Sequence, residues 1–217
     1  MNLNTPSDHI DLIALFFVMS LLPLAMVMLT SFTKISIVLS LLRNALGVQQ
    51  VPSNLVIAGL SLAATFVIMQ PVAQEIASRV NLEDTLRGRK PLSILVAIEQ
   101  ASDPVRTFLH TNAKPSEREF FAKALRAQRN DPNIDEKSFS VLIPAFVISE
   151  IGAAFEIGFL LYLVFAIVDL VVANVLMAMG MTMFAPTVIS IPLKLLVFVA
   201  ASGLPRLMHS LVLSYTT

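Results

Sequence analysis

The stretch LIPAFVISEIGAAFEIGFLLYL, residues 142–163, decides the fold class of this sequence. It carries two charged side chains, Glu150 and Glu156, in an otherwise largely apolar run. Apolar sequence extends over about 65 residues after Phe139, which leaves room for two or three helices of membrane-spanning length. The sequence therefore predicts an all-α, multi-helix protein that associates with a membrane.

The composition agrees with a membrane protein that has one polar insert. Hydrophobic residues make up 56% of the 217 residues and charged residues 14%, whereas roughly a quarter of a typical soluble domain is charged. The net charge is zero, but 11 of the 15 basic and 9 of the 15 acidic side chains lie in residues 78–140. The rest of the chain is too poor in charge for a single soluble domain or a disordered chain. A nucleic-acid binder would need a basic excess.

Two apolar blocks precede the insert, Leu12 to Thr33 and Leu55 to Val72. The segment between them is more polar, and Lys34 and Arg43 have no acidic residue beside them there. Because short loops rich in Lys and Arg stay in the cytoplasm, we expect this segment to be a cytoplasmic loop. The N-terminus and residues 78–140 then lie on the periplasmic side.

Local signals mark the ends of these predicted helices. Pro23 should kink the first block, and Gly47 is expected to end a helix before Ser53 caps the next one. The second block is expected to close at Gln70 and Pro71. The first block is not expected to be a cleaved signal peptide, because no basic residue precedes it and no small-residue cleavage motif follows.

The insert is expected to be a small, solvated and mainly helical excursion. An amphipathic stretch begins at Pro91, and Ser116 with Glu119 resembles a capping box at the start of a second helix. Residues 130–136, NDPNIDE, predict a loop. The chain is thus divided into an N-terminal helical hairpin (1–77), a polar insert (78–140) and a C-terminal apolar hairpin (141–217).

Charged residues embedded in the C-terminal apolar part are its most unusual feature. Each would cost about 2.5–3.5 kcal/mol at the centre of a bilayer, so they are expected to face protein or water. Lys194 is the expected cation of a buried or intersubunit pair. Small residues in the same region let helix backbones approach closely. The charged set is Glu150, Glu156, Asp169 and Lys194, and the small residues are Gly152, Ala154 and Gly158.

The densest motif is MAMGMTM, residues 177–183, with methionine at every second position. Gly180 in its centre and Pro186 after it favour a bend. Two interpretations stay open. Methionine fills irregular gaps in cores, and its soft side chain also suits a surface that deforms around variable cargo. In the second interpretation Met177, Met179, Met181 and Met183 line a pore.

Enzymatic chemistry has little support in the sequence. There is no cysteine, which excludes disulfides and cysteine-ligated zinc. The three histidines, His9, His110 and His209, share no ligand spacing with carboxylates. No phosphate-binding glycine loop and no serine-nucleophile motif occurs. We expect no cofactor, no metal and no enzymatic activity.

Several motifs together resemble the FliP/SctR family, the export gate of flagellar and injectisome type III secretion systems. They occur in order over nearly the whole chain, the insert excepted. They are TSFTKI (30–35), LLRNALGVQQVPSN (41–54), LIPAFVISEI (142–151), AFEIGFLLYL (154–163), VDLVVANVLMAMGM (168–181) and ISIPLKLLVFV (189–199).

The resemblance implies a pore-forming subunit through which unfolded proteins cross the bacterial inner membrane. Family members are helical, and several copies assemble with two smaller partner subunits into a helical, conical pore. A methionine loop lines that pore as a gasket, which carries over to Met179, Met181 and Met183. The lack of a leader favours the injectisome branch over the flagellar one. A secondary transporter, which also uses broken helices and midplane charges, is the alternative from another class.

Overall fold

The structure is a computed structural model that describes residues 6–48, 50–80, 94–181 and 183–215. Its helices are α1 (Pro6–Leu29), α2 (Phe32–Leu46), α3 (Asn54–Val80), α5 (Ile94–Asn112), α6 (Pro115–Arg129), α7 (Phe139–Ala178), α8 (Thr187–Ala200) and α9 (Gly203–Leu213). No strand occurs in these ranges, and the predicted all-α class is confirmed.

The first apolar block ends earlier than predicted, and a helix follows it in place of a loop. α1 ends at Leu29, and α2 begins at Phe32 after a bend of 82°. The predicted cytoplasmic loop is therefore largely wrong, because α2 occupies most of it. Its buried residues Ile35, Val38 and Leu42 recur every three or four positions, as on one face of a helix. Gly47 ends α2 as expected, with φ +75°.

The helix α3 begins where predicted but runs nine residues beyond its predicted end at Pro71. The Ser53 hydroxyl accepts a hydrogen bond from the Val56 N–H at 3.4 Å, so Ser53 does act as a cap. Pro71 cannot donate to the carbonyl one turn earlier. Helices in apolar surroundings tolerate such a proline when the freed carbonyl finds other partners. The predicted end at Gln70 and Pro71 is therefore wrong.

Within the insert, α5 packs against α3 and α7, and α6 packs against α7. The predicted start at Pro91 lies outside the described residues, and 130–136 is a loop as expected. The predicted capping box is wrong. α6 begins at Pro115, no side chain caps it, and Glu119 pairs with Lys123 at 2.6 Å. Proline at the first helical position already lacks the N–H that a cap would satisfy.

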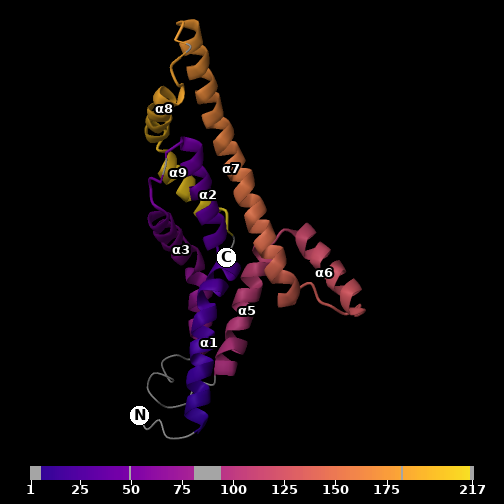
Figure 1. Ribbon diagram of the computed structural model, residues 1–217. Helices are drawn as coiled ribbons and strands as arrows, with labels where there is room; N and C mark the ends of the chain where they lie inside the picture. The colour runs from indigo at the N-terminus through magenta and orange to yellow at the C-terminus, as the bar shows by residue number, and fades with distance from the viewer. Residues whose placement is uncertain (1–5, 49, 81–93, 182, 216–217) are drawn as a thin grey trace.

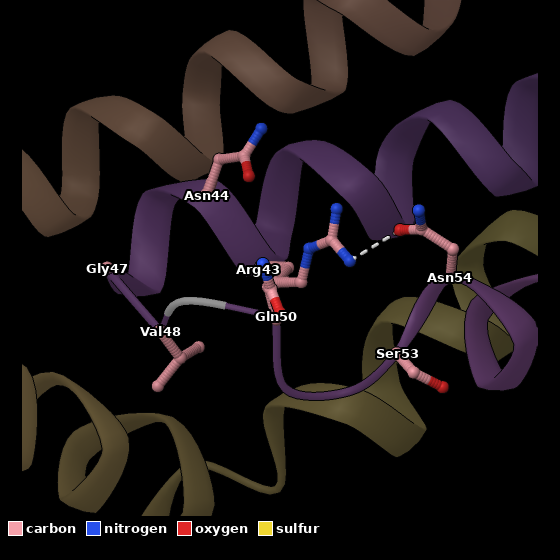
Figure 2. Close-up of a pocket in the computed structure, with 7 residues that line it drawn as sticks. All are labelled: Arg43, Asn44, Gly47, Val48, Gln50, Ser53 and Asn54. Carbon is pink, nitrogen blue, oxygen red and sulfur yellow. Dashed lines mark hydrogen bonds between the residues drawn. The ribbon is translucent and has the colours of Figure 1, made fainter.

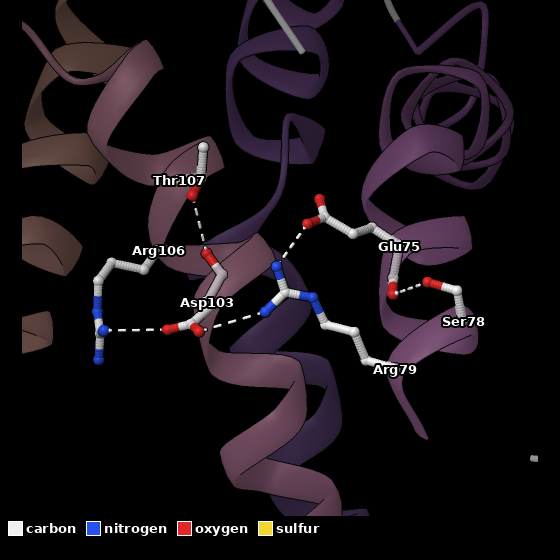
Figure 3. Close-up of polar contacts among 6 residues, drawn as sticks. All are labelled: Glu75, Ser78, Arg79, Asp103, Arg106 and Thr107. Carbon is white, nitrogen blue, oxygen red and sulfur yellow. Dashed lines mark hydrogen bonds and ion pairs between the residues drawn. The ribbon is translucent and has the colours of Figure 1, made fainter. Parts of the chain in front are cut away.

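Charged side chains hold the end of α3 beside α5 (Figure 3). Arg79 contacts Glu75 at 2.7 Å on its own helix and Asp103 at 3.2 Å on α5. Asp103 also pairs with Arg106 at 3.2 Å. These side chains are partly exposed, and such pairs are each worth about 0–1 kcal/mol. The network therefore aligns the two helices more than it stabilises the fold.

The helix α7 forms the long axis of an elongated molecule (Figure 1). It has 40 residues and leads to the α7–α8 turn at one end of the molecule, while α1 extends toward the opposite end. The core lies where α2, α5, α7 and α9 meet. Its fully buried side chains include Ile35, Leu109, Leu142, Phe146 and Leu211.

Much of the apolar surface stays uncovered. Its large exposed hydrophobic side chains lie on α3, α7 and α8 among others, and the total accessible surface of the chain is 14234 Å², whereas a compact monomer of 23.7 kDa is expected to expose about 9,800 Å² in total. In the described part of the chain, α7 and Asn54–Arg79 of α3 are each long and apolar enough to cross a membrane. The bent pairs α1–α2 and α8–α9 raise the possible number of spans to four.

Candidate functional site

The methionine motif forms the turn between α7 and α8, and the predicted bend at Gly180 is confirmed. Gly180 has φ +75°, a conformation that glycine adopts without steric cost. Its N–H donates to the Met177 carbonyl and the Met181 N–H to the Leu176 carbonyl, both at 3.0 Å. This pair of hydrogen bonds is a Schellman motif, which ends a helix and reverses the chain.

All four methionines of the motif are exposed, and Met183 is fully so. The α7–α8 turn that carries them lies at one end of the molecule (Figure 1). Gap filling in the core of this chain therefore does not explain them. A cluster of long, flexible apolar side chains on a turn is suited to contact other chains.

A buried ion pair lies where α2 crosses α7. Lys34 Nζ is 3.2 Å from Glu150 Oε1, and the two residues are 6% and 2% exposed. Lys34 was expected in a solvated loop without a counter-ion, and this expectation is wrong. The amphipathic pattern of α2 places it on the helix face that packs against α7. Burial makes both charges costly unless they pair, and here each is the partner of the other.

Tyr215 completes this cluster from the C-terminal segment. Its hydroxyl donates to Glu150 Oε2, and Lys34 Nζ lies 3.8 Å from the centre of its ring. The ring also stacks on Phe108 of α5 at 6.2 Å between centroids. Burial and the Glu150 carboxylate raise the pKa of Tyr215 far above its usual value, so the phenol stays a donor. No sequence motif marks Tyr215, and sequence reasoning missed it.

A second ion pair ties α8 to α7. Lys194 Nζ is 2.6 Å from Asp169 Oδ2 and donates to the Ala45 carbonyl at the end of α2 at 3.3 Å. Lys194 is 5% exposed, whereas Asp169 is only partly buried. Within this chain Lys194 therefore pairs with Asp169, and not with Glu150 or Glu156. The pair fixes α8 beside α7, the two helices that the methionine turn joins.

Glu156 differs from the other embedded charges because it is exposed. It pairs with Lys114 at 2.9 Å, next to the turn between α5 and α6. The Lys114 N–H also donates to the Ser149 hydroxyl at 2.9 Å, so this turn is held on α7. Within this chain Glu156 is not a buried charge, and an intersubunit role for it stays a prediction.

The small residues of α7 play different parts. Gly158 is buried against α2, where an added Cβ would lie 2.2 Å from Leu41 Cδ1. Ala154 is fully buried in the core. Gly152 has nothing within 4 Å of an added Cβ. Close helix packing is thus supplied by Ala154 and Gly158 inside this chain, and a packing role for Gly152 stays a prediction.

These features define a class of protein. A chain of long apolar helices, with its embedded charges paired and much apolar surface exposed, is a helical membrane protein whose surface other chains or lipid must cover. The FliP family model matches residues 15–211. The chain belongs to the FliP family, as the sequence motifs predicted.

Similar proteins come from secretion and from flagellar systems. Yop proteins translocation protein R of Yersinia pestis is 42% identical over 96% of this chain and 97% of its own length. Hypersensitivity response secretion protein HrcR of Ralstonia nicotianae is 42% identical over 96% and 98%. Flagellar biosynthetic protein FliP of Pectobacterium carotovorum is 42% identical over 91% of this chain but 75% of its own length. Several of the most similar proteins are named for translocation or secretion, which supports the injectisome branch.

Proposed function

We propose that this chain is a core pore-forming subunit of a type III protein secretion export gate, which passes unfolded proteins across the bacterial inner membrane. Its membership of the FliP family and its similarity to proteins named for secretion and translocation support this role. The role is structural and not catalytic, so other components supply the energy of export. Family membership favours this role over the secondary-transporter alternative.

One observation carries the proposal: four methionines are exposed on a turn at the end of the α7–α8 hairpin. Several copies of this turn around an axis would form a ring of flexible apolar side chains. Such a ring closes by side-chain packing and deforms when an unfolded chain enters. The Lys194–Asp169 pair would hold each turn in place, because it joins the two helices that carry the turn.

Replacing Met179, Met181 and Met183 together with alanine tests the gasket. Alanine side chains are too short to meet across a ring, so we expect increased leakage of small ions through membranes that contain the assembled complex. Met19 of α1 is also exposed, and its replacement by alanine is the matched control. Unchanged permeability in the triple variant, with the complex still assembled, would contradict a gasket.

The proposed partners are several copies of this chain and two smaller subunits. Exposed apolar side chains on α3, α7 and α8 support this, because such surfaces are stable in water only when another chain or lipid covers them. They include Phe66 of α3, Phe159 of α7 and Val199 of α8.

The division of the chain into three parts, with boundaries at residues 77 and 140, stays a prediction.

The proposed orientation leaves the N-terminus and residues 78–140 on the periplasmic side. The buried Lys34 no longer supports it, and the orientation now depends on Arg43, which lies in the last turn of α2 (Figure 2) and donates to the Pro52 carbonyl in the turn between α2 and α3. The helix α3 separates that turn from the insert, so if α3 spans the membrane the two lie on opposite sides. A basic turn is then expected to face the cytoplasm.

A further inference from the structure

His110 and Arg118 meet at the corner between α5 and α6 in the polar insert. His110 lies in the last turn of α5, and Arg118 lies near the start of α6. The Arg118 Nη1 contacts His110 Nε2. A guanidinium has donors and no acceptor, so His110 must accept this hydrogen bond through an unprotonated Nε2. The contact therefore requires a neutral imidazole.

The side chain of Arg118 depends on His110 for its hydrogen bonding. Arg118 is half-buried. Among the described residues, His110 is the only one that accepts a hydrogen bond from its guanidinium, and the Arg118 Nε is buried without a partner. Polar groups withdrawn from water lose free energy when their hydrogen bonds are not replaced. Loss of His110 as an acceptor would therefore remove the contact that holds Arg118 at the corner.

The surroundings of His110 favour its neutral form. Four charged groups from two elements face it: Arg118 on α6, and Asp135, Glu136 and Lys137 in the segment before α7. The helices α3 and α7 also pack against α5, but no described charged group on them shifts the pKa of His110. Burial and the two cations lower this pKa below its ordinary value of 6.5, and the two carboxylates oppose them only in part.

The same corner fixes α6 to the rest of the molecule. Lys114, between the two helices, pairs with Glu156 of α7 at 2.9 Å, and its N–H donates to the Ser149 hydroxyl. Beyond the corner, α6 packs mainly on α7 and stands off from the long axis of the molecule (Figure 1). The contact between His110 and Arg118 is therefore well placed to decide how firmly α6 is held.

We propose that His110 is a pH-sensitive latch, which holds α6 at the α5–α6 corner when neutral and releases it when protonated. Protonation removes the lone pair that accepts from Arg118, and it places a third cation beside Arg118 and Lys137. The released corner binds the proton more tightly than the closed one. The corner is therefore fully held above about pH 6.5 and weakens as the pH falls below this value. This latch would act whether or not the chain is an export-gate subunit.

Hydrogen–deuterium exchange of the full-length chain, purified with whatever chains accompany it, tests the latch at about pH 7.5 and about pH 5.5. Exchange of the backbone amides of α6 is corrected for its intrinsic dependence on pH. One pH unit below the ordinary pKa of histidine allows up to about tenfold more opening. We therefore expect the protection of α6 in the wild type to fall several-fold at the lower pH.

His110→Gln keeps an acceptor but cannot gain a proton, so it should protect α6 equally at both pH values. His209→Gln, at an exposed position on α9, is the matched control and should behave as the wild type does. His110→Lys carries a permanent charge and should protect α6 poorly at both pH values.

Wild-type protection that is the same at both pH values would overturn the latch. Dependence on pH that persists in His110→Gln would also overturn it, and would assign the effect to another group such as Asp135 or Glu136. If His110→Lys does not fold, the comparison of the wild type with His110→Gln still decides between these outcomes.

Discussion

Lys34 and Glu150 show how charges can occur in so apolar a chain. Each is buried, and each is the other's counter-ion across the α2–α7 contact. Removing one partner leaves an uncompensated buried charge, whereas replacing both with apolar groups does not. The pair therefore makes the contact between α2 and α7 specific, whether or not it adds net stability.

Lys34→Met should lower the free energy of unfolding by about 3–5 kcal/mol, because Glu150 is left without a cation. The double variant Lys34→Met, Glu150→Leu should recover most of this loss. Thermal or denaturant unfolding of the purified protein measures both. Lys114→Met is the matched control: it removes the partner of the exposed Glu156 and should cost less than about 1 kcal/mol. A double variant as unstable as the single one would contradict this account of the pair.

Gly158 tests the packing of α7 on α2. An added Cβ would lie 2.2 Å from Leu41 Cδ1 and 3.1 Å from Leu41 Cβ, so rotating the end of Leu41 cannot remove the clash entirely. Gly158→Ala should cost about 1–3 kcal/mol of stability in the same unfolding measurements. Gly152→Ala is the control, because its Cβ meets nothing within 4 Å. Equal effects of the two substitutions would show that α2 and α7 are not packed this closely.

At the scale of elements, the sequence predicts helices better than it predicts how they break and pair. The long apolar run after Phe139 predicted helix in the region of α7, and Gly180 predicted the bend that follows α7. The end of α2 at Gly47 was predicted, but its length was missed because its serines, lysine and arginine resemble a loop in composition. The recurrence of Ile35, Val38, Leu39 and Leu42 was the signal that could have found it.

The ion pairs could not be predicted in the same way. Lys34, Glu150 and Tyr215 meet only because α2, α7 and the C-terminal segment pack together. Spacing within one helix says nothing about contacts between distant segments. For this reason the charges were identified from the sequence as embedded, but Lys194 was expected beside the glutamates when its partner is Asp169.

The orientation of α3 can be measured directly, because the sequence contains no cysteine. Single cysteines are introduced as Ser53→Cys in the α2–α3 turn and Asn130→Cys in the insert, both at exposed positions. A thiol reagent that does not cross membranes is applied to the periplasmic side of spheroplasts. We expect it to label the cysteine at 130 and not the one at 53. Labelling of both, or of the one at 53 alone, would contradict the proposed orientation.

At the scale of the whole molecule, the exposed apolar surface is the main finding. The total accessible surface, 14234 Å², is roughly 1.4 times that expected for a compact monomer, and many large hydrophobic side chains are part of it. The composition suggested a membrane protein, and the structure adds that its embedded charges are paired within the chain. The remaining apolar faces, on α3, α7 and α8, are exposed and available to other chains or to lipid.

The intact mass of the complex that carries this chain tests the central claim most directly. The chain is purified from membranes together with the products of neighbouring genes, and the mass of the undissociated assembly is measured. An export-gate subunit predicts several copies of this 23.7 kDa chain with two kinds of smaller subunit in a fixed ratio. A monomer, or an assembly of this chain alone, would contradict the claim.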